Sequence, residues 1–74
     1  MKVGVAGLGV IGRAVCRALD EGIAGLTLAA ATARDRDKAE RFLKGLARPA
    51  PFLPLAALGA AADLVVVAST RAHL

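Results

Sequence analysis

Short apolar runs alternate with amphipathic segments along the 74 residues of the chain. Val3, Val5 and their neighbours form the first run, which stops at Gly7 as a buried strand would. Residues 26–32 (LTLAAAT) and 64–68 (LVVVA) are further runs of strand length, and the last is the clearest of them. The pattern therefore predicts a strand in each of these runs.

The segment after the first run has the spacing of an amphipathic helix. Apolar residues recur at Ile11, Val15 and Leu19, while charged residues fall on the other side. This helix is predicted to begin near Val10 or Ile11 and to stop at Gly22.

A second amphipathic segment follows the second strand and is strongly charged. Asp35 or Asp37 is expected to cap its first turn, because either carboxylate can accept hydrogen bonds from free amides. Ion pairs Asp37–Arg41 and Glu40–Lys44 are expected on its exposed side. The predicted apolar stripe of this helix consists of Ala39, Phe42, Leu43 and Leu46.

All three prolines lie in the segment RPAPFLP at 48–54. It allows only a brief strand around Phe52 and Leu53, at a sheet edge where proline is tolerated. A short alanine-rich helix is predicted over 55–61, and Ser69 and Thr70 resemble the cap of a helix that scarcely begins. The order β-α-β-α-β-α-β predicts the α/β class, with a parallel sheet and flanking helices truncated after about four strands.

Composition and charge exclude several classes of protein. With 57% hydrophobic residues the chain is too apolar for a disordered segment, yet no apolar run reaches the roughly 18 residues of a membrane span. The single cysteine excludes an internal disulfide and fits a reducing compartment, so we expect a cytoplasmic protein with no membrane partner. The net charge is +4, but with two phenylalanines as the only aromatic residues no nucleic-acid partner is expected.

Three glycines follow the first strand at the spacing Gly7-x-Gly9-x-x-Gly12. They stand between a predicted strand and a predicted helix within about 30 residues, which is the context of a Rossmann-type dinucleotide-binding turn. In such a turn Gly7 allows the tight bend, Gly9 lets the backbone approach a pyrophosphate, and Gly12 lets the helix pack on the strand. The alternative is a chance match in a glycine-rich chain. Arg13 and Ala14 do not supply the residues of a Walker phosphate loop.

The end of the second strand is expected to select the cofactor. An acidic residue there binds the ribose hydroxyls of NAD, whereas an arginine accommodates the 2′-phosphate of NADP. Thr32 occupies the expected acidic position and Arg34 follows two residues later, so NADP is favoured and NAD is accepted. In the alternative, Arg34 is solvated and Asp35 only caps the next helix.

Few other residues are candidates for chemistry. Ser69 and Thr70 follow the last strand, on the rim where ligands bind, and either face the nicotinamide-side ribose or cap a helix. Cys16 is interpreted as a small packing residue, and His73, without a neighbouring carboxylate, as an exposed residue near the chain end. No catalytic residue and no metal site are therefore predicted.

Three stretches, MKVGVAGLGVIGRAV, LTLAAATARDRDKAERF and PLAALGAAADLVVVAS, resemble the amino-terminal domain of L-aspartate dehydrogenases, within the homoserine dehydrogenase-like NAD(P)-binding group. The resemblance implies hydride transfer between L-aspartate and NAD or NADP, giving iminoaspartate for NAD biosynthesis or for hydrolysis. Val67 departs from the family pattern, in which an acid often follows the valines. The resemblance assigns Gly7, Gly9, Val10, Ile11 and Gly12 to the pyrophosphate, Arg34 to the adenosine ribose, and Ala68, Ser69 and Thr70 to the nicotinamide half.

The chain is short for this family, whose catalytic histidine and substrate-binding residues lie in a carboxyl-terminal region. We therefore expect residues 1–74 to be a partial dinucleotide-binding domain without the substrate domain, and catalytically incomplete alone. An uncovered apolar sheet face and an unpaired last strand would favour self-association. Two alternatives stay open: a fragment of a dihydrodipicolinate reductase-like or other Rossmann oxidoreductase, and a dinucleotide-sensing module without chemistry.

Overall fold

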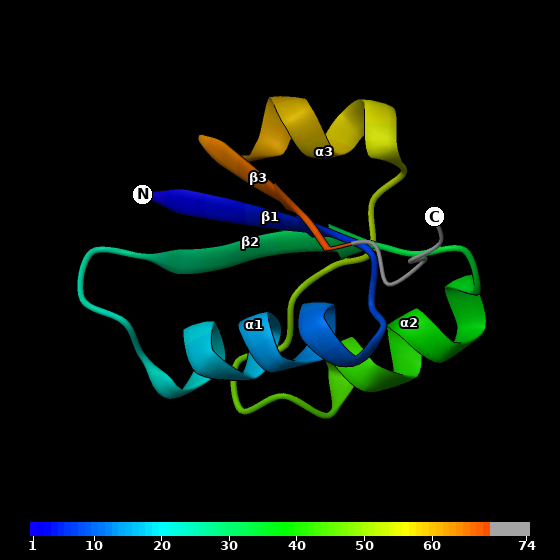
Figure 1. The fold of residues 1–74 in the computed structure, drawn as a ribbon, viewed down its shortest axis with the longest axis horizontal. Coiled ribbons are helices and arrows are strands. Elements are labelled where there is room, and N and C mark those ends of the chain that lie inside the picture. Colours follow the sequence, from blue (N-terminus) through cyan, green and yellow to red (C-terminus); the bar gives the residue numbers. More distant parts are fainter. Residues whose placement is uncertain (69–74) are drawn as a thin grey trace.

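Three parallel strands form one sheet with helices on both of its faces (Figure 1). The computed structural model describes residues 1–68. The strand order is β2-β1-β3, so the predicted α/β class with a Rossmann-type parallel sheet is confirmed. In chain order the elements are β1 (Lys2–Ala6), α1 (Val10–Glu21), β2 (Thr27–Thr32), α2 (Arg36–Lys44), α3 (Leu55–Ala61) and β3 (Leu64–Val67).

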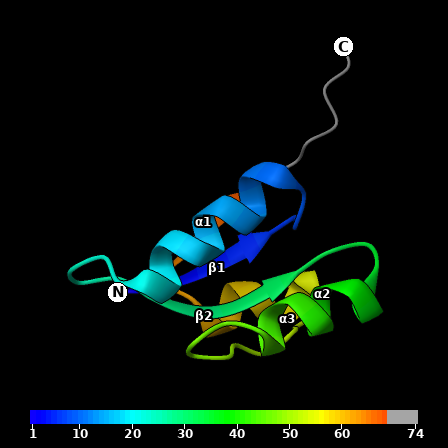
Figure 2. The same cartoon turned by 90° about the horizontal axis from the view of Figure 1, so that it is seen from below.

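Helices α1 and α2 lie on one face of the sheet and α3 lies on the other (Figures 1 and 2). α3 approaches β1 closely because Gly4 has no side chain, and a Cβ atom there would stand 2.9 Å from Leu58 Cδ1. Leu58 is fully buried at this contact. A glycine inside a strand often marks such a close approach, and Gly4 therefore allows α3 to cover the second face.

The segment around Phe52 forms a single parallel bridge to Ala31 at the outer edge of β2. Ala31 N–H donates to Pro51 O (3.1 Å), and Leu53 N–H donates to Ala31 O (3.0 Å). The bridge does not extend into a longer strand. Pro51, on one side of it, has no N–H to donate, and α3 begins directly after Pro54 on the other side. The edge position is as expected, but the sheet has three strands among the described residues, so the prediction of about four is wrong.

Helix α1 packs on the sheet through small side chains. It begins at Val10, as predicted, and its buried residues are Gly12, Cys16 and Leu19. The interpretation of Cys16 as a packing residue is therefore confirmed. Ile11 is 58% exposed, so its assignment to the packed stripe is wrong.

Helix α2 begins after a cap supplied by Asp35, whose Oδ1 accepts a hydrogen bond from Lys38 N at 3.1 Å. Ala39 and Leu43 are buried, as the predicted stripe requires. On the exposed side Arg36 pairs with Glu40 at 3.1 Å. Within residues 1–68 neither of the two predicted ion pairs of this helix forms, and Glu40 pairs with Arg36 in place of Lys44.

The loop after α2 is fastened to the end of α1 by Asp20. Its carboxylate accepts hydrogen bonds from Ala47 N (2.9 Å) and Arg48 N (2.8 Å). Arg48 Nη2 in turn donates to Asp20 O at 3.1 Å. The hydrogen bonds from Arg48 and Ala47 favour the ionised carboxylate and hold the pKa of Asp20 below its ordinary value.

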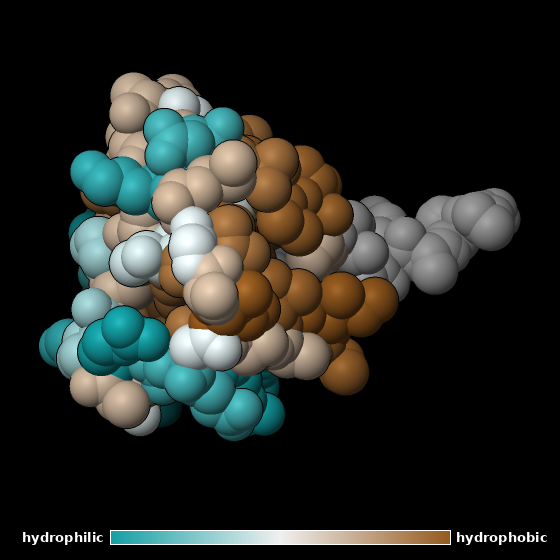
Figure 3. All heavy atoms as spheres, turned by 90° about the vertical axis from the view of Figure 1, so that its left-hand side faces the viewer, coloured by the Kyte–Doolittle hydropathy of each residue, from teal (hydrophilic) through white to brown (hydrophobic). Residues whose placement is uncertain are grey.

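Apolar side chains collect on the side of the molecule where β3 and α1 lie (Figure 3). β3 pairs with β1, and within the described residues its other edge has no ladder partner. Helix α3 lies on the sheet face that the sequence predicted to be uncovered, so that part of the prediction is wrong. Self-association itself stays a prediction. Among the helices of residues 1–68, none is both long and apolar enough to cross a membrane. The large exposed apolar residues of β3 and α1 are Val10, Ile11, Leu64 and Val67.

Candidate functional site

The carboxyl ends of the three strands meet at one edge of the sheet. Gly7 N–H, just past β1, donates to Thr32 O at the end of β2 (2.8 Å). Ala68 N–H, just past β3, donates to Ala6 O at the end of β1 (2.8 Å). The three loops that follow the strands are therefore held together, as is usual where an open parallel sheet binds a ligand.

The turn between β1 and α1 depends on two of the three glycines of the motif. Gly7 has φ 105°, a conformation that side chains disfavour. A Cβ atom on Gly12 would lie 1.8 Å from Gly7 O, so the start of α1 touches the backbone of the turn. The predicted roles of Gly7 in the bend and of Gly12 in close packing agree with this geometry.

The amino terminus of α1 carries free amide groups. Gly9 is the residue before the helix, and the first helical hydrogen bond runs from Arg13 N to Gly9 O (3.0 Å). The amides of Val10, Ile11 and Gly12 precede that bond and have no carbonyl partner within the helix. Within residues 1–68 no side chain caps this end, and its first turn contains no acid. The partial positive charge of the helix end is therefore available to an anion.

A pocket of about 500 Å³ opens at this edge of the sheet. Of the predicted cofactor residues, Gly7, Gly9, Arg34 and Ala68 line it together. Gly12 lies behind the turn, and Val10 and Ile11 are exposed outside the lining. Ser69, Thr70 and His73 lie outside the described residues. The remaining lining residues are Ala6, Leu8, Arg13, Ala33, Asp35, Lys38, Ala39 and Phe42.

Two cations of the pocket wall were not predicted from the sequence. Arg13, directly after the last glycine of the motif, donates from Nε to Leu8 O (3.1 Å), and its Cζ lies 5.6 Å from the centre of the Phe42 ring. Arg17, one turn further along α1, stacks on the same ring at 5.5 Å. Lys38 enters the wall from the first turn of α2. The positions of Arg13 and Lys38 in the sequence could have indicated their place in the pocket wall, because each lies in the first turn of a helix that follows a strand of the sheet.

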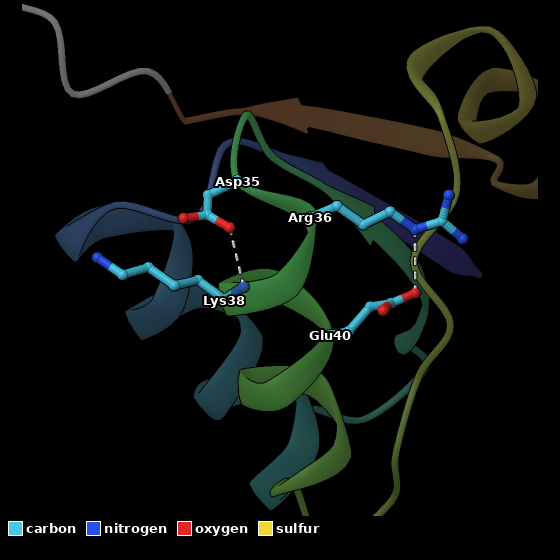
Figure 4. Close-up of polar contacts among 4 residues, drawn as sticks. All are labelled: Asp35, Arg36, Lys38 and Glu40. Atoms are coloured by element: carbon cyan, nitrogen blue, oxygen red, sulfur yellow. Dashed lines mark hydrogen bonds and ion pairs between the residues drawn. The ribbon is translucent and has the colours of Figure 1, made fainter.

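The first turn of α2 sends its charged side chains in different directions (Figure 4). Arg36 extends towards the segment of Phe52, over whose ring its Cζ lies at 5.2 Å, and pairs with Glu40. Lys38 extends the other way, towards α1. The alternative role considered for Asp35, capping α2, is observed.

The residues of this pocket fit a dinucleotide. A turn with a glycine at positive φ leads into a helix end without an acid, and this arrangement suits a pyrophosphate. Arg13, Arg34 and Lys38 add positive charge on the same wall, with Asp35 as the acid among the lining residues. The fold and the pocket together define a dinucleotide-binding domain.

Comparison with known proteins identifies the family. The family described as homoserine dehydrogenase, NAD binding domain, matches residues 7–73, and the chain belongs to it. The chain is 47% identical over 74 residues to an L-aspartate dehydrogenase of Bradyrhizobium diazoefficiens, and it covers 26% of that protein. It is 41% identical over 75 aligned positions to L-aspartate dehydrogenase 3 of Bordetella bronchiseptica, covering 28% of it.

The chain thus spans about a quarter of the length of these curated relatives, and both alignments include all of it. No solved structure matches the chain. The family and its relatives establish the resemblance to L-aspartate dehydrogenase, and NAD or NADP as the cofactor.

Proposed function

We propose that the chain is the NAD(P)-binding part of an L-aspartate dehydrogenase, an enzyme that transfers a hydride between L-aspartate and NAD or NADP to give iminoaspartate. The observation that carries the proposal is the 47% identity to such an enzyme along the entire chain. The alignment with that enzyme includes every residue that lines the pocket at the carboxyl edge of the sheet.

In this proposal the residues of the chain bind and orient the cofactor. The amides at the start of α1, with the backbone of Gly7 and Gly9, hold the pyrophosphate. Arg34 lies beside the adenosine ribose, and Ala68 borders the nicotinamide half. The nicotinamide supplies the hydride chemistry, and the protein supplies a fixed position for it relative to the substrate.

A chimera tests the function directly. Residues 1–74 replace the matching amino-terminal part of the Bradyrhizobium diazoefficiens relative, and the reduction of NAD or NADP is followed at 340 nm with L-aspartate as substrate. We expect aspartate-dependent reduction with one or both cofactors. Succinate, which lacks the amino group that is oxidised, serves as the substrate control.

A second chimera carries Gly9→Val, which places a side chain in the pocket next to the turn. We expect it to retain its fold, measured by circular dichroism, and to lose cofactor binding. A folded parent chimera that binds neither NAD nor NADP would contradict the proposal. If the parent chimera binds a cofactor but does not reduce it with L-aspartate or any other amino acid as substrate, the assignment to aspartate is refuted.

A further inference from the structure

Arg13 connects the glycine turn with the second helix on the same face of the sheet. Its Nε donates to Leu8 O (3.1 Å), the carbonyl that stands between the first two glycines of the motif. Its Cζ lies 5.6 Å from the centre of the Phe42 ring in α2. Arg13, Leu8 and Phe42 all line the cofactor pocket. The inference below rests on the proposed function, because it concerns the same turn and the same pocket.

The peptide between Leu8 and Gly9 is the part of the turn that the backbone does not hold. Before it, Gly7 N–H donates to Thr32 O (2.8 Å), and after it Arg13 N–H donates to Gly9 O (3.0 Å). Within residues 1–68 no backbone hydrogen bond uses Leu8 O or Gly9 N–H. A peptide that leads into a glycine can rotate at small cost, because glycine allows both signs of φ. The bond from Arg13 Nε to Leu8 O therefore selects one orientation of this peptide.

The orientation matters for an anion because the two sides of a peptide carry opposite partial charges. The peptide between Leu8 and Gly9 is trans, so its carbonyl and its N–H point in opposite directions. With Leu8 O turned to Arg13, the Gly9 N–H is held on the opposite side. Successive backbone amides form a concave site for anions, and the Gly9 N–H precedes the free amides of Val10 and Ile11 in the chain. A rotated peptide would replace this amide by a carbonyl oxygen, which repels a phosphate.

The ring of Phe42 holds the guanidinium of Arg13 beside the turn. Within residues 1–68 no carboxylate pairs with Arg13 and draws it elsewhere. An arginine loses much side-chain entropy when it makes a hydrogen bond, and contact with a ring has already restricted this one. Arg17 stacks on the same ring at 5.5 Å, but it neither lines the pocket nor bonds to the turn. Arg17 is therefore a matched control for Arg13.

We propose that Arg13 is a positioning residue of the cofactor site. It holds the peptide between Leu8 and Gly9 so that the turn presents an amide, and not a carbonyl oxygen, to the pyrophosphate of the dinucleotide. Phe42 in turn holds Arg13. The turn requires a hydrogen-bond donor at the position of the Arg13 Nε, and the charge of the side chain is secondary. Because the effect acts on the turn, it extends to every ligand with the same diphosphate: NAD, NADP and ADP.

Two substitutions of Arg13 separate the hydrogen bond from the charge. The Nε2 of glutamine is as many bonds from the backbone as the Nε of arginine, so Arg13→Gln keeps the donor and removes the charge. Arg13→Met has a similar length and no donor. Dissociation constants of ADP, NAD and NADP are measured by calorimetric titration of the 74-residue chain. We expect Arg13→Met to weaken all three by about tenfold and Arg13→Gln by about threefold or less, because an unmade hydrogen bond costs more than a screened charge.

Arg17→Gln and Arg17→Met form the control pair, and both should leave the three constants unchanged. Kinetics of the chimera described above give a second readout. There Arg13→Met should raise the KM of the cofactor and leave kcat unchanged, since the held turn binds the cofactor equally in the ground state and in the transition state. Circular dichroism should show the same fold for the parent and both Arg13 variants.

Phe42→Leu tests the support of Arg13 independently of Arg13→Met. It should weaken ADP binding about threefold in the parent chain and have no effect in Arg13→Gln, because glutamine carries no charge for the ring to hold. This comparison decides the matter if Arg13→Met does not fold. Equal weakening in both backgrounds would show that the ring does not act through Arg13, and would overturn its part in the proposal.

The outcomes separate this inference from the proposed function. Equal losses in Arg13→Gln and Arg13→Met would show that the charge of Arg13 acts on the phosphates directly, and the positioning role would be wrong. A loss confined to NADP, or an Arg13→Met chain that binds as tightly as the parent, would overturn it too. Each of these results leaves dinucleotide binding in place. A parent chain that binds none of the three ligands would overturn both proposals.

Discussion

Replacement of Gly12 by alanine would place a methyl group against the backbone of the turn before α1. The added Cβ would lie 1.8 Å from Gly7 O and 2.8 Å from Gly7 C, whereas ordinary contact begins at 3.4 Å. The turn or the helix must therefore move by about 1.6 Å, the difference between these two distances. Both the turn and the helix meet this contact with backbone atoms, which cannot rotate away as a side chain can. Hydrogen bonds also hold them, because Gly7 N–H donates to Thr32 O and Arg13 N–H donates to Gly9 O.

Overpacking of a core costs about 1–3 kcal/mol, and a contact between two stretches of backbone belongs at the upper end. For a domain of this size about 3 kcal/mol corresponds to a fall in Tm of roughly 12–24 °C. Urea unfolding followed by circular dichroism at 222 nm measures the change, because the chain has no tryptophan or tyrosine for fluorescence.

Gly59→Ala is the matched control in α3. A Cβ atom there meets nothing within 4 Å, and alanine in a helix interior is about 0.5–1 kcal/mol more favourable than glycine. Gly4→Ala is intermediate, since its Cβ meets the movable side chain of Leu58 at 2.9 Å. The expected order of stability is Gly59→Ala, parent, Gly4→Ala, Gly12→Ala. A Gly12→Ala chain as stable as the parent would refute the close packing of α1 on the turn.

Two further predictions concern Asp20 and Cys16. Because hydrogen bonds lower the pKa of Asp20 in the folded chain, its contribution to stability is complete above the unfolded value of about 3.9 and is lost as the pH falls through the lowered pKa. Asp20→Ala should therefore lower the Tm at pH 7, and the difference from the parent should shrink below about pH 4; a constant difference across this range would argue against the role of the carboxylate. Burial raises the pKa of the Cys16 thiol to about 11, so at pH 8 Ellman's reagent should label the chain rapidly in urea and very slowly without it. Rapid labelling of the folded chain would show that this helix face is open.

The sequence pattern was sufficient where structure is local. Apolar runs and the spacing of Gly7, Gly9 and Gly12 mark a strand, a turn and a helix start, because each depends on residues that are neighbours in the chain. α3 was predicted at 55–61 and is observed there. The sequence predicted that Asp35 or Asp37 caps α2, and the structure shows that Asp35 is the cap.

Features that depend on tertiary packing were not predicted. Ile11 has the right spacing for a buried stripe, but α1 packs through Gly12 and Cys16, whose small size lets the helix lie close to the sheet. The close approach of α3 at Gly4 could not be predicted, because Leu58, which lies against Gly4, is 54 positions away in the sequence. Lys38 joins the pocket only because α1 and α2 lie on the same face.

Phe42 has a consequence for how quickly an anionic ligand reaches the site. Its ring supports the guanidinium of Arg13 at 5.6 Å, where other proteins would use a carboxylate. An aromatic face orients a cation through its quadrupole and leaves the full charge in place, whereas an ion pair would cancel it. Arg34 and Lys38 line the same pocket as Arg13, and at physiological salt the field of such charges is screened over a length of about 8 Å. We therefore expect the ring to contribute to the rate of ligand capture, since positive charge at the pocket attracts an anionic dinucleotide before contact.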